Sequence, residues 1–313
     1  MPSIARLVFL PLLVVLLATG VARAGVPVAV SIPPQAHFVE AIGGDHVEVQ
    51  TMVPATAEPV TYEPTPRQMS ALSRAELYFA TGVPFEKAWL PRFRSANSDM
   101  TVIDTTARIQ RRAMAADHDH DRGADKDRHA TPAYNALDPH VWLSPALVRL
   151  QAESIRDALI AADPKHAADY HRGFRRFAEQ IHRLDQGILD ALTDIDPSAR
   201  RFLVFHPAFG YFAASYGLEQ MAIEVEGKEP GPRELARIIE EARGHGIRVI
   251  FIEPQFAQGA ARTIAREIGG EVVTLDPLAR DWPDGMRAIA ETLAAALGNA
   301  PSHETAPTHG HEH

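Results

Sequence analysis

Residues 164–194 read PKHAADYHRGFRRFAEQIHRLDQGILDALTD, and this segment organises the rest of the chain. Its large apolar residues recur at steps of three and four, at Tyr170, Phe174, Phe177, Ile181, Leu184, Ile188 and Leu192. That spacing is typical of one face of a single α-helix, which would be roughly 45 Å long at 1.5 Å per residue. The pattern predicts a strut that crosses both halves of the molecule, and an ordinary core helix inside one domain is the alternative.

Two sets of short apolar segments flank this helix, and each set alternates with helical stretches. The first set is Val26–Ile32, Val47–Val53, Leu77–Ala80 and Thr101–Asp104, and the second is Phe202–Phe205, Gln220–Ile223, Val249–Ile252 and Glu271–Leu275. Strands that alternate with helices indicate parallel βαβ units, and a chain of 313 residues exceeds the usual size of one hydrophobic core. We therefore expect an α/β protein of two (β/α) lobes with four-stranded parallel sheets, over residues 25–162 and 197–298, joined by one long helix within 163–196.

Helix ends are marked in the sequence as well. Thr65-Pro66 has the pattern of an N-cap followed by the first helical residue. The helices expected at Ala208–Tyr216 and Gln258–Ile268 are followed by Gly217 and Gly269, which suit left-handed C-caps.

The composition excludes several classes of protein. The chain has no cysteine, which rules out disulfides, thiolate metal sites, a catalytic thiol and a lipid-anchoring cysteine, so any metal must be held by nitrogen and oxygen ligands. The formal charge of −9 argues against a nucleic-acid partner, because binding a phosphate backbone requires a basic face.

The N-terminus has the pattern of a cleaved secretory signal, which we place at residues 1–24. Arg6 precedes an apolar run from Leu7 to Ala18, and Ala22-Arg23-Ala24 is a small-x-small cleavage pattern. Removal of Arg6 and Arg23 takes the formal charge from −9 to −11. The mature protein is expected to be soluble outside the cytoplasm.

Two segments of low complexity are rich in histidine. Residues 117–129 read DHDHDRGADKDRH and include His118, His120 and His129, and the tail 299–313 carries four more histidines. Neither segment can bury apolar surface, so both are expected to be mobile, either as weak metal collectors or as a solvated loop and tail. His118-x-His120 resembles the start of a dinuclear metallohydrolase motif, but Arg122 and Gly123 stand where that motif requires Asp and His, so the sequence argues against such a hydrolase site.

The residues with metal-binding chemistry lie after predicted strands. His206 follows Phe202–Phe205, Asp276 follows Glu271–Leu275, and His140 lies in the segment after Thr101–Asp104. Ligands of open α/β sheets bind beyond the carboxyl ends of the strands. If the lobes face each other, two imidazoles and one carboxylate converge on the cleft and can hold a divalent ion.

Five segments in series carry a family resemblance. The first segment extends from Val53-Pro54 to Pro64-Thr65-Pro66. The other four are Asp138-Pro139-His140-Val141-Trp142-Leu143-Ser144-Pro145, Phe205-His206-Pro207-Ala208-Phe209-Gly210-Tyr211-Phe212-Ala213, Glu226-Gly227-Lys228-Glu229-Pro230 and Phe251-Ile252-Glu253-Pro254-Gln255-Phe256. The whole mature chain resembles the periplasmic zinc- and manganese-binding proteins of ABC importers, the cluster A-I solute-binding proteins. The resemblance implies two lobes joined by one long helix, and delivery of metal to a membrane permease driven by a cytoplasmic ATPase.

The resemblance also implies a set of ligands, with one departure. It assigns His140, His206 and Asp276 to the metal, whereas the family's first ligand, usually a His, falls on Val60. Glu58 or Glu63, water, or a His of the segment 117–129 are the alternatives for the fourth position.

Ligand type favours zinc, because two imidazoles and a carboxylate suit it while manganese prefers more oxygen; manganese, nickel and ferrous iron are the alternatives. We expect a monomeric periplasmic binding protein without enzymatic activity. A zinc buffer or metallochaperone, a manganese- or iron-specific importer component, and a metallohydrolase with Glu63 or Glu253 as base are the competing hypotheses. Since imidazole must be neutral to bind a metal, affinity should fall below about pH 6.

Overall fold

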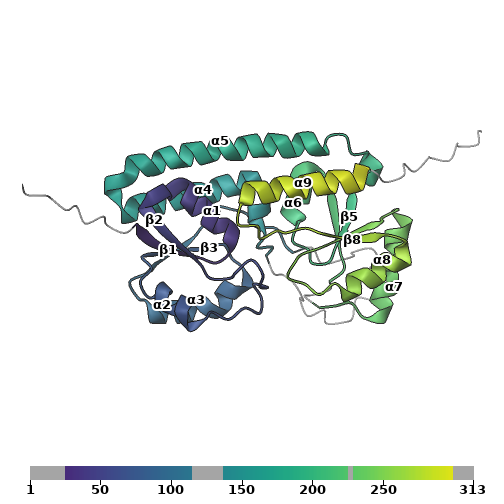
Figure 1. Cartoon of the computed structure of the whole chain (residues 1–313), viewed down its shortest axis with the longest axis horizontal. Coiled ribbons are helices and arrows are strands. Elements are labelled where there is room, and N and C mark those ends of the chain that lie inside the picture. The colour runs from purple at the N-terminus through teal and green to yellow at the C-terminus, as the bar shows by residue number, and fades with distance from the viewer. Residues whose placement is uncertain (1–24, 115–136, 225–227, 299–313) are drawn as a thin grey trace, which may run out of the picture.

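The computed structural model describes residues 25–114, 137–224 and 228–298, and Figure 1 shows two lobes beneath one long helix. The first lobe comprises β1 (Val26–Val30), α1 (Pro33–Gly43), β2 (Val47–Thr51), α2 (Pro66–Leu72), β3 (Leu77–Ala80), α3 (Pro84–Ala96), β4 (Thr101–Asp104) and α4 (Pro145–Ala162). The second comprises β5 (Arg201–Val204), α6 (Gly210–Tyr216), β6 (Glu219–Ala222), α7 (Pro232–Gly244), β7 (Val249–Ile252), α8 (Gly259–Ile268), β8 (Glu271–Thr274) and α9 (Trp282–Gly298). Short 3₁₀ turns at Gly44–His46, Val141–Leu143, Pro164–His166 and Pro197–Ala199 complete the order.

Both sheets are parallel and have the same topology. Their strand orders are β2-β1-β3-β4 and β6-β5-β7-β8, and every pairing between neighbouring strands is parallel. The first strand of each lobe is therefore flanked by the next two strands along the chain, one on either side. The predicted α/β fold with two four-stranded parallel sheets is confirmed.

The helix between the lobes, α5 (Ala167–Leu192), has 26 residues and is roughly 39 Å long. It packs against α1 and α4 of the first lobe and against α9 at the C-terminus, so it runs over both lobes in Figure 1. Its buried face carries the predicted apolar residues Tyr170, Phe177, Ile181, Leu184, Ile188 and Leu192, with Phe174 half-buried. The single long helix is confirmed, and it crosses both lobes.

Two tryptophans fasten the β8–α9 connection to the first lobe. Trp142 Nε1 donates a hydrogen bond of 2.8 Å to the carbonyl of Pro277, and Trp282 Nε1 donates one of 2.7 Å to the carbonyl of Trp142. Both side chains are buried, and the ring of Phe38 on α1 packs edge-on against Trp282 at 5.2 Å. The two lobes therefore share one continuous apolar core at this junction.

The marked helix ends lie where the sequence predicts them. The Thr65 side chain accepts a hydrogen bond from the backbone of Gln68, which completes a capping box with the Gln68 side chain. Gly217 and Gly269 adopt left-handed conformations, with φ of 67° and 65°. The first strand ends at Val30 rather than at Ile32, because Pro33 already begins α1 and the chain must turn before it.

Several predictions concern parts of the chain outside the described residues. These are the signal segment 1–24, residues 117–129 with His118, His120 and His129, the tail 299–313, and Glu226 of the fourth motif. The lobe boundaries at residues 162 and 197 also stay predictions. Within the described ranges, no helix combines the length and the apolar character that crossing a membrane requires.

Candidate metal centre

A cavity of about 280 Å³ lies between the two lobes. The first lobe contributes Glu58, Pro59, Val60, Val83, Pro84, Met114, Pro139, His140 and Trp142, and the second contributes His206, Ala208, Glu224, Glu253, Gln255, Phe256, Pro277 and Leu278. The second-lobe residues follow the carboxyl ends of the strands, which is where parallel sheets bind ligands. A larger hollow of about 830 Å³ lies at the opposite edge of the second sheet, near Arg201 and Arg248 at the starts of β5 and β7. Because this hollow lies at the other end of the strands from the paired imidazoles, we place the site in the cavity between the lobes.

His140 is held by Asp138, two residues before it. One carboxylate oxygen of Asp138 accepts a 2.9 Å hydrogen bond from the His140 backbone N–H and lies 2.7 Å from its Nδ1. Burial lowers the pKa of His140, although the hydrogen bond and charge of Asp138 oppose that shift. The side chain is therefore kept neutral at pH 7, with its Nδ1–H donating to the Asp138 carboxylate and its Nε2 open to a ligand.

His206 is held in the same way from a neighbouring strand. It lies just beyond β5, and its Nδ1 is 2.5 Å from an oxygen of Glu224, which lies just beyond β6. Burial opposes the charged imidazole, but the hydrogen bond to Glu224 and the negative charges of Glu253, Glu224 and Glu58 outweigh it, so the pKa of His206 is raised. Its Nε2 is likewise left for a ligand.

The segment after His206 is fixed by Gln220 on β6. The Gln220 side chain accepts a hydrogen bond of 2.9 Å from the Phe209 backbone and donates one of 3.3 Å to the carbonyl of Pro207. The hydroxyl of Tyr211 donates to the carbonyl of Asp138 at 3.3 Å, and this bond joins the segments that carry the two histidines.

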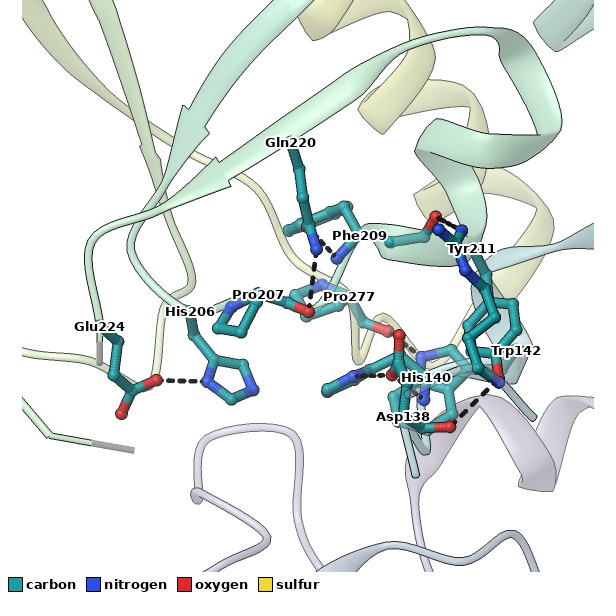
Figure 2. A network of polar contacts seen from close by, with 12 residues as sticks. Asp138, His140, Trp142, His206, Pro207, Phe209, Tyr211, Gln220, Glu224 and Pro277 are labelled. Carbon is teal, nitrogen blue, oxygen red and sulfur yellow. Dashed lines mark hydrogen bonds and ion pairs between the residues drawn. The ribbon is translucent and has the colours of Figure 1, made fainter. Parts of the chain in front are cut away.

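The two imidazoles face each other across the cavity. Their ring centroids are 5.3 Å apart, and Figure 2 shows the rings of His140 and His206 pointing toward one another. Aromatic rings cover the pair on two sides, with Trp142 at 5.1 Å from His140 and Phe256 stacked at 5.4 Å on His206. This arrangement presents two nitrogen donors to a small ligand and limits access of water to it.

Glu253 is a buried carboxylate in the wall of the same cavity. It is 2% exposed and directly follows β7, and neither of its oxygens has a hydrogen-bond partner. The backbone N–H groups of Glu253 and His206 are close enough to lower its pKa, but they do not reach hydrogen-bonding geometry. Burial dominates, in spite of the nearby His206, and raises the pKa of Glu253 to about 7.

Asp276 is placed differently from the other predicted ligands. It is half-buried and does not line the cavity, and one of its oxygens accepts a 2.8 Å hydrogen bond from the backbone of Leu278. Burial raises its pKa, while the backbone N–H of Leu278 and the nearby Gln255 side chain act to lower it. Strand β8 lies two places from β5, which at about 4.8 Å per strand separates their ends by roughly 10 Å.

The structure thus brings the rings of His140 and His206 together, whereas Asp276 directly precedes the cavity-lining residues Pro277 and Leu278 without lining the cavity itself. Among the described residues, no group of three or more His, Asp or Glu side chains has metal-binding geometry.

The family model described as "Zinc-uptake complex component A periplasmic" matches residues 28–296 of this sequence. The chain belongs to this family. Among its relatives, a putative metal-binding protein of Chlamydia muridarum is 30% identical over 85% of this chain and 90% of its own length. The high-affinity zinc uptake system protein ZnuA of Bacillus subtilis is 27% identical, over 78% of this chain and 76% of its own. Zinc-binding protein AdcA of Streptococcus pyogenes is 28% identical over 82% of this chain, which spans only about half (51%) of that relative.

Solved structures of the zinc-uptake component family share the whole architecture. A crystal structure of ZnuA is 39% identical, with a TM-score of 0.78, over 87% of this chain and 99% of that one. A ZnuA variant with residues 138–173 of its own sequence deleted and zinc bound is 39% identical, with a TM-score of 0.79, over 87% of this chain and 98% of that one. The resemblance read from the five sequence segments is confirmed.

The sequence resemblance predicts the first metal ligand at position 60, where this chain has Val60. Val60 is 57% exposed and lines the cavity, so an apolar side chain stands at its rim. Glu58 lines the cavity too, whereas Glu63 is exposed and does not. Of the two carboxylates predicted as possible fourth ligands, the structure places only Glu58 at the cavity.

The sequence did not indicate the roles of Asp138 and Glu224 at this site, and it indicated Glu253 only as the base of the metallohydrolase alternative. Asp138 lies in the same motif as His140, and Glu224 and Glu253 follow strands on either side of β5. The strand order is the signal that would have found the last two, but it cannot be read from a single sequence.

Proposed function

We propose that the protein is a periplasmic solute-binding protein that captures a divalent transition-metal ion, zinc in the first place, and delivers it to the membrane permease of an ABC importer. The observation that carries this proposal is the pair of imidazoles of His140, which is buried, and His206, which is partly buried; they face each other between the lobes with each Nδ1 held by a carboxylate. That outer support is the usual arrangement around metal-binding histidines, because it fixes the ring and raises its basicity.

The donor chemistry supports zinc as the cargo. Neutral imidazole nitrogens suit zinc and neighbouring first-row metals, whereas magnesium and calcium require oxygen. We include Asp276 as a carboxylate ligand, because it follows a strand at the same edge of the sheet and matches the family's ligand position. Manganese and ferrous iron are the alternative ions if the site has more oxygen donors than two imidazoles and the Asp276 carboxylate provide.

Transport rests on the family and on the architecture. The matching family model describes a periplasmic zinc-uptake component, and AdcA and ZnuA are named for zinc binding and zinc uptake. A cavity between two lobes can release its ion to a permease that docks over both of them. The competing role is a zinc buffer, which would bind the ion without serving a permease.

A titration tests the binding site. Zinc affinity is measured by competition with a chromogenic chelator for the wild type, for His206→Ala, and for His182→Ala, which removes an exposed histidine of α5 as a matched control. We expect His206→Ala to lose tight binding and His182→Ala to keep it. Unchanged stoichiometry and affinity in His206→Ala would remove the basis of the proposed site.

A reconstitution tests the transport role. The purified protein is added to vesicles that contain the cognate permease and ATPase, and ATP-dependent uptake of radioactive zinc is measured. We expect stimulation by the wild type and none by His206→Ala. Tight zinc binding without any stimulation of uptake would favour the buffer.

A further inference from the structure

We propose that the carboxylate of Glu253 is itself a ligand of the bound metal and supplies the donor that Val60 cannot. This inference rests on the proposed function, because it names a residue that would hold the cargo of the same cavity. The consequence is a site in which Glu253 adds a carboxylate donor beside the imidazoles of His140 and His206.

The first argument is the state of the side chain. Glu253 is 2% exposed and both of its oxygens lack hydrogen-bond partners, while it lines the cavity. Buried polar groups are normally satisfied, and a buried carboxylate without partners is costly unless it is paired or coordinates a metal. An ion placed in the cavity would satisfy it.

The second argument is the position of Glu253 relative to His206. Strand β7 pairs directly with β5, with Leu203 opposite Ile250 and Val204 opposite Phe251. Residues that follow these two strands are therefore about one strand spacing apart, roughly 5 Å, whereas Asp276 lies one strand further away. Glu253 and His206 both line the cavity between the lobes.

The third argument links Glu253 to Val60, the position at which the sequence resemblance predicts a histidine ligand. Gln255, two residues after Glu253, donates a 2.6 Å hydrogen bond from Nε2 to the carbonyl of Ala55 in the segment that leads to Val60. The segment that carries Glu253 and the segment that carries Val60 are thus fastened together across the two lobes.

Other carboxylates of the cavity are less suited to this role. Glu224 already accepts the hydrogen bond from His206 Nδ1. Glu58 is only half-buried, and its nearest side-chain partner is the hydroxyl of Thr61 at 3.5 Å. Glu253 alone among these three is both fully buried and unpaired.

The experiment compares carboxylate variants in the full-length protein. Zinc affinity is measured by chelator competition, and Co²⁺ is added as a spectroscopic probe whose visible absorption reports the donor set. Glu253→Gln removes the charge at nearly constant shape, Glu253→Asp keeps the charge but withdraws it by one methylene, and Glu63→Gln is the matched control on an exposed carboxylate. Circular dichroism and thermal melting verify that each variant is folded.

We expect Glu253→Gln to weaken zinc binding by at least about 100-fold, which is the upper end of the effect of removing a residue that supports a ligand only indirectly. Glu253→Asp should also weaken binding, both Glu253 variants should change the Co²⁺ spectrum, and Glu63→Gln should match the wild type in both measurements. Val60→His combined with Glu253→Gln should recover affinity, because it restores a donor at the family's first-ligand position.

The outcomes separate this inference from the proposed function. If His206→Ala abolishes binding while Glu253→Gln and Glu253→Asp leave the affinity and the Co²⁺ spectrum unchanged, Glu253 is not a ligand and the proposed function stands. If affinity falls in the Glu253 variants but the Co²⁺ spectrum does not change and Val60→His gives no recovery, the role of Glu253 is structural and the inference is wrong. If His206→Ala also binds normally, the whole site is wrong.

Discussion

Because α5 packs closely on α1, replacing glycine by alanine at two positions of α5 should change the stability of the protein in opposite directions. Gly173 and Gly187 both lie within α5, but Gly173 is buried against α1 whereas Gly187 is exposed. A Cβ added at Gly173 would lie 2.1 Å from the carbonyl oxygen of Ile42 and 2.8 Å from its carbon, and a Cβ at Gly187 would meet nothing within 4 Å. Because the obstacle at Gly173 is backbone, no side-chain rotation relieves it and α5 must move away from α1.

The two effects can be estimated separately. Alanine in a helix interior is more favourable than glycine by about 1 kcal/mol, and Gly187→Ala should gain that amount. Gly173→Ala gains the same term but introduces an overpacked contact that costs about 1–3 kcal/mol or more, so we expect a net loss of roughly 1–2 kcal/mol. The two variants should differ by about 2–3 kcal/mol, which is on the order of 5 °C in Tm for a chain of this size.

Thermal unfolding followed by circular dichroism measures this difference, and urea titration of the same variants gives the free energy of unfolding. Zinc affinity, measured in parallel, should be unaffected by Gly187→Ala. If Gly173→Ala is as stable as Gly187→Ala, the close packing of α5 on α1 is wrong, and with it the account of α5 as a strut fixed on the first lobe.

Three further predictions concern the cavity and its supports. Because Glu224 and its acidic neighbours raise the pKa of His206, protons should compete with zinc already above pH 6.5, and apparent affinity should fall by up to about tenfold per pH unit below that pKa; equal affinities at pH 7.5 and pH 5 would contradict this. Glu224→Gln removes the charged partner of His206 Nδ1 and should weaken zinc binding about 10–100-fold, and a chelator titration that shows no change would exclude that support. Trp142→Phe leaves the buried carbonyl of Pro277 without its donor and should cost about 1–3 kcal/mol of stability, and an unchanged urea midpoint would show that this bond does not hold the β8–α9 connection.

The fold could be predicted from the sequence because its signals are local. The apolar face of α5 repeats every three or four residues, the strands are short apolar segments with helices between them, and Gly217 and Gly269 mark helix ends by a conformation that glycine adopts without strain. None of these signals depends on residues far away in the chain. The contacts that join the lobes, such as the hydrogen bond from Trp282 to Trp142, depend on pairs 140 residues apart and left no such signal.

The candidate site was predictable in part for a related reason. His140 and His206 could be selected because they follow strands and lie in recognisable motifs, and the structure places their rings 5.3 Å apart. Asp276 was selected by the same rule; one of its oxygens accepts a hydrogen bond from the backbone of Leu278, and its role as a ligand stays a prediction. Position after a strand identifies the edge of a sheet but not which residues of that edge are neighbours.

Strand order supplies the missing information, and it explains the distribution of charge around His206. The second sheet runs β6-β5-β7-β8, so Glu224 and Glu253 follow the strands on either side of β5, and Asp276 follows the strand beyond. An imidazole between two carboxylates becomes more basic, as the raised pKa of His206 shows, and the same negative charges attract a divalent cation. The Glu224 carboxylate accepts the hydrogen bond from His206 Nδ1, whereas the Glu253 carboxylate has no hydrogen-bond partner among the described residues. An ion between the lobes would therefore meet an oriented imidazole and an unpaired carboxylate that follow adjacent strands. These two groups are neighbours only because the chain crosses from β6 on one side of β5 to β7 on the other.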